Sequence, residues 1–341
     1  MIPHVTDAVQ QWIETVAYEP VDGRAGPPDV CLVELGGTVG DIESAVFLEA
    51  IQQFQARVGY TNCCTILVGL VPVMGVVGEQ KTKPVQHAVK LLRQTGLLPD
   101  FVFCRLKEPL LEDTRSKISL FCQVDISRVI SLHDCSNVFH VPLLMEDQHL
   151  GLRLLERLGL SSAGRGERPP TPRLATVVGR DHLTEWRHMA SVIDGLKEEI
   201  TIAVVGKYTG LQDSYLSVIK AVEHAATEVG VRARVVWIES ADLEVQLRVT
   251  DPARYDRAWS TLRSAGGVLV PGGFGDRGVE GKVLAAGYCR DHNLPFLGIC
   301  LGLQIAVISF ARDKLGMEAA NSAEFNESTP HPVVVFMPGR F

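Results

Sequence analysis

Short apolar segments alternate with amphipathic segments along most of the chain. In the first half, the segments that predict strands are residues 29–35, 63–73, 100–106 and 127–134. The segments that predict helices are residues 44–58, 84–94 and 114–122. Strands that are apolar throughout and separated by single helices are typical of parallel sheets covered on both faces.

The second half repeats this alternation. Its predicted strands are residues 200–208, 232–240, 266–272 and 294–300, and its predicted helices are residues 214–230, 278–292 and 301–316. The expected fold class is therefore α/β, with two doubly wound domains built on mainly parallel sheets. Ligands of such domains bind at the carboxyl ends of the strands.

The segment between the two halves is rich in Gly, Pro, Ser and Arg, most clearly at residues 161–173. Such a composition is typical of an exposed linker. We predict a first domain at residues 1–158, a linker at residues 159–196 and a second domain at residues 197–341.

Composition narrows the possible classes of protein. The net charge is −7 and no basic tract is present, which argues against a nucleic-acid partner. No apolar run reaches the ~18–20 residues of a membrane-spanning helix, and the start is neither a signal nor a transit peptide. The eight cysteines form no C-x-x-C pair, so a zinc ribbon is unsupported and a reducing, cytoplasmic location is expected.

The first candidate for chemistry is Cys300. An apolar strand runs into Gly298-Ile299-Cys300-Leu301-Gly302 and then into a helix, which is the nucleophile-elbow pattern with Cys in place of Ser. A cysteine at a helix N-terminus is favoured as thiolate. The alternative interpretation is a buried cysteine flanked by turn glycines.

A second apolar strand ends in a glycine-rich turn at residues 268–278. Free backbone N–H groups in that turn would stabilise an oxyanion formed at Cys300, although an ordinary β-turn is the simpler alternative. Together the two motifs resemble the class I glutamine amidotransferase domain, in which the cysteine attacks the side-chain amide of glutamine and ammonia leaves.

That resemblance also implies a histidine base followed two residues later by a glutamate. Only His331 follows Cys300, and His331-Pro332-Val333 lacks the glutamate, so we interpret His331 as a loop residue.

Two segments of the first half carry charges suited to a nucleotide. Residues 34–43 form a glycine-rich turn with the carboxylates of Glu34, Asp41 and Glu43, which suits phosphate and Mg²⁺. Residues 78–86 place Lys81 and Lys83 at a predicted helix start, which suits an anion. The alternative in both cases is a set of solvated surface charges.

With the amidotransferase motifs, these segments resemble the CTP synthase family through nearly the whole chain except the linker. The resemblance implies a glutamine-dependent ligase with a P-loop-like amidoligase domain. ATP would phosphorylate UTP at the 4-oxygen, and ammonia from glutamine would replace the phosphate to give CTP. It also implies Mg²⁺, GTP as an allosteric activator, and a homotetramer that forms filaments.

The resemblance assigns roles to residues of this chain. Glu34 would bind Mg²⁺, Cys300 would be the nucleophile, and the amides of Gly273 and Leu301 would form the oxyanion hole. The residues implied for UTP or CTP are Asp41, Ile42, Glu43, Lys81, Thr82, Lys83, Pro84, Val85, Gln86 and Lys117. Those implied for ATP are His133, Asp134 and Cys135. Those implied for glutamine are Gly273, Leu301, Gly302, Leu303, Gln304 and Glu324.

The sequence departs from the family pattern in two respects. It contains no G-x-x-x-x-G-K motif, and Gly206-Lys207 lacks the loop, so we interpret that pair as structural. Against the family pattern, the first domain lacks its start and the second its end, so we expect this chain alone to be inactive. A non-catalytic regulatory or filament-assembly paralogue that binds CTP or UTP, and another amidotransferase or cysteine hydrolase, remain alternatives.

Overall fold

The computed structural model describes residues 2–21, 23, 25–75, 78–160, 183–207, 212–273 and 275–337. The chain divides into two compact units, residues 1–190 and 191–341. The division falls inside the predicted linker, of which residues 161–182 lie outside the described part. Helix α8 (Thr184–Gly195) occupies the end of that segment, and the domain limits given above stay a prediction.

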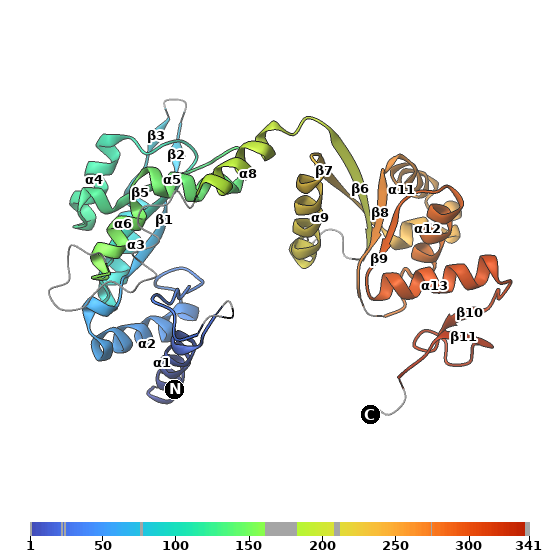
Figure 1. The fold of residues 1–341 in the computed structure, drawn as a ribbon, viewed down its shortest axis with the longest axis horizontal. Coiled ribbons are helices and arrows are strands. Elements are labelled where there is room, and N and C mark those ends of the chain that lie inside the picture. The colour runs from blue at the N-terminus through green and yellow to red at the C-terminus, as the bar shows by residue number, and fades with distance from the viewer. Residues whose placement is uncertain are drawn as a thin grey trace. The chain divides into compact units, whose positions relative to one another are not determined.

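The first unit is built on a parallel three-stranded sheet in the order β1–β4–β5 (Figure 1). Its strands are β1 (Ile66–Leu70), β4 (Phe101–Leu106) and β5 (Val129–His133), and β2 (Val73–Met74) and β3 (Glu79–Gln80) form an antiparallel hairpin. Its helices are α1 (His4–Tyr18), α2 (Ile42–Val58), α3 (Lys83–Gln94), α4 (Glu112–Cys122), α5 (Val141–Asp147) and α6 (Leu150–Arg157). The short 3₁₀ turns are η1 (Tyr60–Asn62), η2 (Ile126–Arg128) and η3 (Val138–His140).

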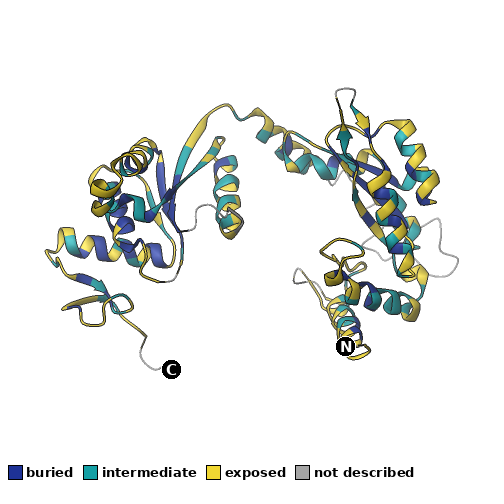
Figure 2. Cartoon of the chain, turned by 180° about the vertical axis from the view of Figure 1, so that it is seen from behind, coloured by how far each residue is buried: buried dark blue, intermediate teal, exposed yellow. Residues whose placement is uncertain are grey.

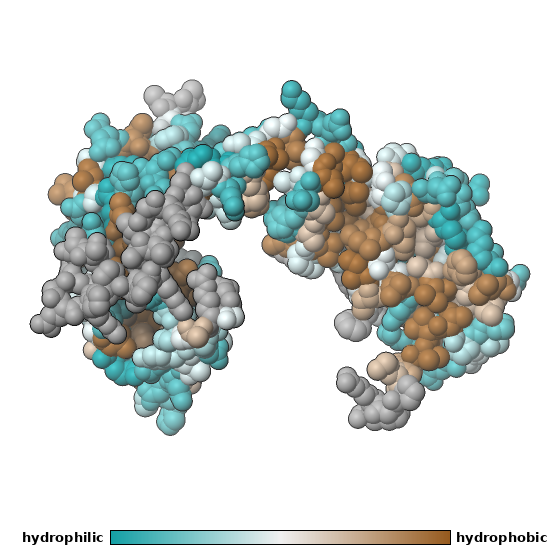
Figure 3. Space-filling view, in the orientation of Figure 1, coloured by the Kyte–Doolittle hydropathy of each residue, from teal (hydrophilic) through white to brown (hydrophobic). Residues whose placement is uncertain are grey.

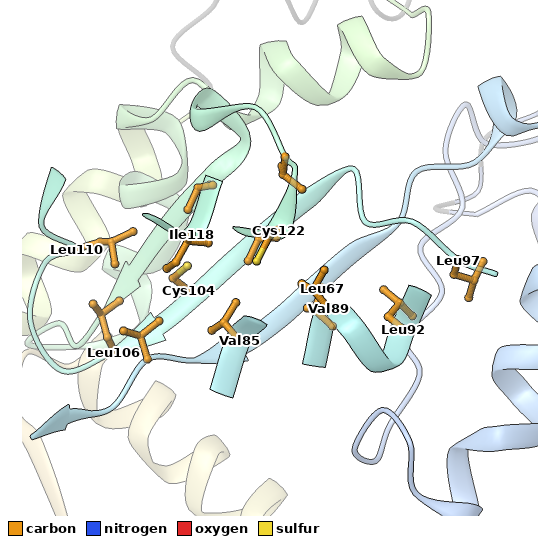
Figure 4. Packing of buried hydrophobic residues seen from close by; sticks show 14 of the residues in the cluster. Leu67, Val85, Val89, Leu92, Leu97, Cys104, Leu106, Leu110, Ile118 and Cys122 are labelled. Carbon is orange, nitrogen blue, oxygen red and sulfur yellow. The ribbon is translucent and has the colours of Figure 1, made fainter. Parts of the chain in front are cut away.

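The central strand β4 has both faces covered, because successive side chains of a strand point to opposite sides. Val102, Cys104 and Leu106 pack in one cluster with side chains of α3 and α4, as Figure 4 shows for part of it. Phe101 and Phe103 belong to a second cluster that includes side chains of α5 and α6. The predicted strand and helices of this region are confirmed.

Residues 29–35 were predicted as a strand, and this prediction is wrong. The structure shows irregular, exposed backbone there, with Leu32 91% exposed. Apolar sequence alone does not make a strand, because a strand also needs a neighbour for its backbone N–H and C=O groups. None of the strands in the described part of the chain pairs with this segment.

The second unit is built on a parallel four-stranded sheet in the order β7–β6–β8–β9. Its strands are β6 (Glu199–Gly206), β7 (Arg232–Glu239), β8 (Gly267–Val270) and β9 (Phe296–Gly298), and β10 (Ala320–Ser322) and β11 (His331–Val334) form a separate parallel pair. Its helices are α9 (Leu216–Glu228), α10 (Val245–Thr250), α11 (Pro252–Ser264), α12 (Val279–Asp291) and α13 (Leu301–Lys314), with the 3₁₀ turns η4 (Gln212–Tyr215) and η5 (Ser240–Leu243). His331 therefore begins a strand and does not lie in a loop.

Helices lie on both sides of this sheet, with α9 on one side and α11 and α12 on the other (Figure 1). Buried residues concentrate in the central strands of each unit (Figure 2). Apolar side chains also gather on the surface around α13 (Figure 3), where Leu297, Ile299, Leu303, Val307 and Phe310 are each at least 42% exposed. The doubly wound α/β architecture predicted for both halves is confirmed.

Candidate functional site

Cys300 lies where β9 leads into α13. Its backbone has φ 53° and ψ −108°, a strained conformation for a residue with a side chain. Its carbonyl accepts hydrogen bonds from the amides of Leu303 (3.0 Å) and Gln304 (3.2 Å), so it closes the first turn of the helix. Cys300 is exposed, and the alternative of a buried cysteine does not hold.

The two glycines that flank Cys300 are required by close backbone packing. A Cβ added at Gly302 would lie 2.1 Å from the carbonyl oxygen of Val270 in β8. A Cβ added at Gly298 would lie 2.4 Å from the carbonyl carbon of Gly302. Real Cβ atoms do not approach this closely, so the G-x-C-x-G spacing follows from a helix start pressed onto the neighbouring strand.

The glycine turn after β8 faces Cys300. A Cβ added at Gly272 would lie 3.2 Å from Cys300 Cβ and 3.7 Å from its Sγ, and one added at Gly273 would lie 4.0 Å from Leu301 Cδ2. The structure therefore brings this turn close to Cys300 and Leu301, and the role of the Gly273 and Leu301 amides in an oxyanion hole stays a prediction. The first amides of a helix have no acceptor within the helix, so they are suited to bind an oxyanion.

The residues expected to bind glutamine are only partly gathered. Gly302, Leu303 and Gln304 follow Cys300 on the first turn of α13. Glu324 is exposed in the turn after β10, and its backbone N–H donates to Ser322 Oγ at 3.2 Å. Among the described residues, the hydrogen bonds and ion pairs do not join its carboxylate to the α13 turn, so its role stays a prediction.

Two buried lysines of the second unit, Lys207 and Lys282, were not predicted as functional. Lys207, 8% exposed at the end of β6, donates from Nζ to the carbonyl of Gly275 at 2.8 Å, which agrees with a structural role. Lys282 on α12 is 2% exposed. Burial, and next the charge of Lys207, lower the pKa of Lys282 to about 8, and Glu239 opposes the shift. The sequence signal is its spacing, because Lys282 lies three residues after the buried Val279 on the apolar face.

In the first unit, the segment that leads from β3 into α3 holds two of the three predicted nucleotide lysines, Lys81 and Lys83. Lys81 Nζ forms an ion pair with Glu79 at 2.6 Å, and both side chains are largely exposed. The Lys81 contacts, and more weakly the charge of Lys117, lower the pKa of Glu79. Lys81 thus contacts this carboxylate, and Lys117, on a different element, influences it through its charge.

Gln80, another residue that the prediction left out, anchors this segment. Its side chain is buried; Nε2 donates to the carbonyl of Pro109 at 2.8 Å, and Oε1 accepts from the amide of Leu111 at 3.0 Å. These bonds tie the Lys81 segment to the loop that leads into α4, which carries Lys117. The sequence offered one indication of this role, because Gln80 is a polar residue that stands between the charged Glu79 and Lys81.

The rest of the predicted lysine segment starts helix α3. Thr82 is buried and its hydroxyl accepts a hydrogen bond from Gln86 Nε2 at 2.9 Å. The Val85 side chain is fully buried in the core, which leaves only its backbone for a ligand. Lys83 and Pro84 are exposed at the helix start.

The carboxylate turn at residues 34–43 is exposed and lies against α3. A Cβ added at Gly40 would lie 3.0 Å from Leu91 of that helix, and one added at Gly37 would lie 2.9 Å from Glu43 Oε1. In the part of the chain that the structure describes, no ion pair joins Asp41 or Glu43 to the predicted lysines. Their convergence on one ligand stays a prediction, as does the contact made by Ile42, which is 95% exposed.

The predicted ATP residues lie at the carboxyl end of β5. Asp134 forms an ion pair with Arg105 of β4, a residue that the sequence did not single out. Cys135 Sγ donates to the carbonyl of His133 at 3.4 Å. The buried Nδ1 of His133 has no hydrogen-bond partner among the described residues, and a buried polar atom of this kind is suited to a ligand.

Glu34 was predicted as a Mg²⁺ ligand. Mg²⁺ in nucleotide sites is typically held by one or two carboxylates and substrate phosphates, so the exposed carboxylates of Glu34, Asp41 and Glu43 are suitable donors. The described side chains of His, Cys, Asp and Glu form no group of three suited to a metal ion.

None of the helices in the described ranges combines the length and apolarity needed to cross a membrane.

Comparison with known proteins also finds two parts in this chain, as the two compact units of the structure do. The family description "CTP synthase N-terminus" matches residues 1–160, and "Glutamine amidotransferase class-I" matches residues 210–333. CTP synthase of Dictyostelium discoideum is 51% identical over 349 residues, covering 99% of this chain and 59% of that protein. CTP synthase 1 of Homo sapiens is 49% identical over 338 residues, covering 99% of this chain and 55% of that protein.

Among solved structures, the glutaminase domain of Trypanosoma brucei CTPS with bound acivicin is 40% identical, with a TM-score of 0.37. That match covers 41% of this chain and 50% of the other. The chain spans between 55% and 59% of the length of the curated relatives cited above. The two consecutive domain matches and about 50% identity along 99% of its length show that the chain belongs to the CTP synthase family.

Proposed function

We propose that this chain serves the ATP-dependent amination of UTP to CTP, with ammonia released from glutamine at Cys300. The observation that carries the proposal is the exposed, strained Cys300 at a helix start, facing the glycine turn at Gly272. The relatives named CTP synthase support the same assignment.

In the glutaminase step, the Cys300 thiolate attacks the side-chain amide carbon of glutamine. The carbonyl oxygen becomes an oxyanion, and the N–H groups of Leu301 and Gly273 would stabilise it. The C–N bond then breaks, the amide nitrogen takes a proton and leaves as ammonia, and a thioester remains. Water hydrolyses the thioester to glutamate and regenerates the thiol.

In the synthetase step, the first unit would bind both nucleotides at the carboxyl end of its sheet. The ammonium groups of Lys81, Lys83 and Lys117 would offset the triphosphate charge, and Glu34 would hold Mg²⁺. Phosphate transferred from ATP to the 4-oxygen of UTP makes that oxygen a leaving group. Attack of ammonia on the ring carbon then expels phosphate and gives CTP.

The family resemblance implies a location, an activator and an assembled state. We place the protein in the cytoplasm, with GTP as an activator and a homotetramer that forms filaments as the assembled state. Nucleotide binding without glutamine chemistry would favour the alternative of a regulatory paralogue.

Labelling with an electrophilic glutamine analogue tests the proposal. Peptide mapping should find Cys300 modified first, and excess glutamine should slow that reaction. Burial is the first cause that raises the thiol pKa of Cys63, Cys64, Cys104, Cys122 and Cys289, so these should react slowly. Cys31 is exposed and serves as the internal control. Equal labelling of Cys31 and Cys300 without protection by glutamine would reject Cys300 as the nucleophile.

A further inference from the structure

Glu79 forms an ion pair with a lysine that is predicted to bind the nucleotide. It stands two residues before Lys81, and its carboxylate Oε2 lies 2.6 Å from the Lys81 ammonium. Residues i and i+2 of an extended backbone share a face, so their side chains project together. The ion pair therefore follows from the local backbone.

The backbone of this segment is held on both sides. Gln80 points inward and bonds the carbonyl of Pro109 and the amide of Leu111. The amide of Lys81 donates to the carbonyl of Pro72 at 2.8 Å. With Gln80 fixed inward, Glu79 and Lys81 are held outward, and the carboxylate stays close to the ammonium.

The contacts with Lys81, and more weakly the charge of Lys117, lower the pKa of the Glu79 carboxyl group. Its carboxylate thus pairs with one lysine predicted to bind a nucleotide phosphate and is influenced by the charge of another. A phosphate oxygen and a carboxylate oxygen seek the same ammonium donors.

We propose that Glu79 is an internal competitor for the nucleotide site: its carboxylate holds Lys81 where a phosphate oxygen would bind and so limits the affinity for triphosphates. This inference rests on the proposed function of the site. Lys81 must leave Glu79 before it can bind a triphosphate. The free energy of triphosphate binding is therefore less favourable by the free energy of that ion pair.

The variant Glu79→Gln tests the competition, with inorganic tripolyphosphate, UTP and CTP as the probes in isothermal titration calorimetry on the full chain. Glu79→Gln should bind tripolyphosphate about two- to fivefold more tightly, the range that exposed ion pairs contribute. The matched control Glu112→Gln removes an exposed carboxylate paired with Arg115 at 3.6 Å and should change binding much less.

A double variant separates competition for Lys81 from general charge repulsion. In a Lys81→Gln background, competition predicts that Glu79→Gln no longer tightens binding, whereas simple repulsion predicts that the gain persists. A persistent gain, an unchanged affinity, or weaker binding by Glu79→Gln would overturn the inference.

The probes also separate this inference from the proposed function. If tripolyphosphate follows the expected pattern but UTP and CTP bind no more tightly than tripolyphosphate, the nucleotide function fails and the role of Glu79 stands. If UTP and CTP bind and Glu79→Gln has no effect on any probe, the role of Glu79 fails alone. Absence of binding by all three probes to both proteins would reject both.

Discussion

Gly302 and Val270 approach so closely that a Cβ added at Gly302 would lie 2.1 Å from the Val270 carbonyl oxygen. The start of α13 is thereby pressed onto β8, and Cys300, two residues earlier at the helix N-cap, takes a positive φ. Because the obstacle is backbone, it cannot move aside as a flexible side chain would.

Gly302→Ala should therefore displace the elbow. We expect a loss of about 1–3 kcal/mol in the free energy of unfolding, the usual range for overpacking. Labelling of Cys300 by the glutamine analogue should slow by about 10²-fold, since small displacements of a nucleophile are costly. Denaturant unfolding and peptide mapping measure the two effects.

The matched control is Gly195→Ala, because no atom lies within 4 Å of a Cβ added at Gly195. It should change the unfolding free energy by less than about 0.5 kcal/mol and leave labelling unchanged. Equal behaviour of the two alanine variants would contradict the close packing of Gly302.

Lys282→Met should stabilise the second unit at neutral pH. The folded pKa of Lys282 is lowered from 10.5 to about 8, so the unfolded chain binds the proton more tightly. The free-energy cost of burying the charged Lys282 is fully present below about pH 8. The free energy of unfolding therefore rises as the pH increases from 8 toward 10.5. Removing the buried charge should add about 1–3 kcal/mol at pH 7, and the gain should shrink by pH 9.5.

Thermal unfolding across this pH range measures the effect. Lys220→Met is the control, because Lys220 is half-exposed and paired with Glu223 at 2.7 Å. A destabilised Lys282→Met at pH 7, or a gain that grows with pH, would show that the Lys282 charge is compensated in the folded protein.

Asp100→Asn should strongly destabilise the first unit. Asp100 and Arg157 form an ion pair of 2.6 Å with side chains 1% and 7% exposed, and Asp100 also accepts a hydrogen bond from the Tyr60 hydroxyl at 2.7 Å. The variant leaves the buried guanidinium without its counter-charge, which costs about 3–5 kcal/mol.

The exposed pair between Glu14 and Arg57 provides the comparison for Asp100→Asn, with side chains 45% and 48% exposed. Glu14→Gln should cost less than about 1 kcal/mol in denaturant unfolding. Similar losses in the two variants would mean that burial does not strengthen the Asp100 pair.

Much of the fold was predictable because its strands are short apolar runs separated by single helices. The predicted strand at residues 100–106 appears as β4, and the predicted helix at residues 301–316 appears as α13. Residues 29–35 have the same apolar composition but no paired neighbour, and this requirement is not visible in a local pattern.

The candidate sites were predictable where chemistry depends on local spacing. The elbow at Cys300 and its glycine turn meet because β8 and β9 are adjacent parallel strands. Gln80 and Arg105 were missed because their contacts join segments distant in sequence, as between Gln80 and Pro109 and between Arg105 and Asp134. Buried Lys282 was missed because a lysine among apolar residues is usually exposed.

Binding of a pyrimidine nucleotide tests most directly the proposal that the first unit holds UTP or CTP at the Lys81 segment. UTP or CTP with Mg²⁺ should raise the melting temperature of the chain in a concentration-dependent way. Lys81→Gln should weaken binding at least about tenfold, as expected for the loss of a hydrogen bond to a charged group. Lys90→Gln, an exposed lysine on the same helix as Lys83, should bind like the unaltered protein. The absence of any shift with UTP or CTP, or equal shifts for the Lys81 and Lys90 variants, would contradict the nucleotide site.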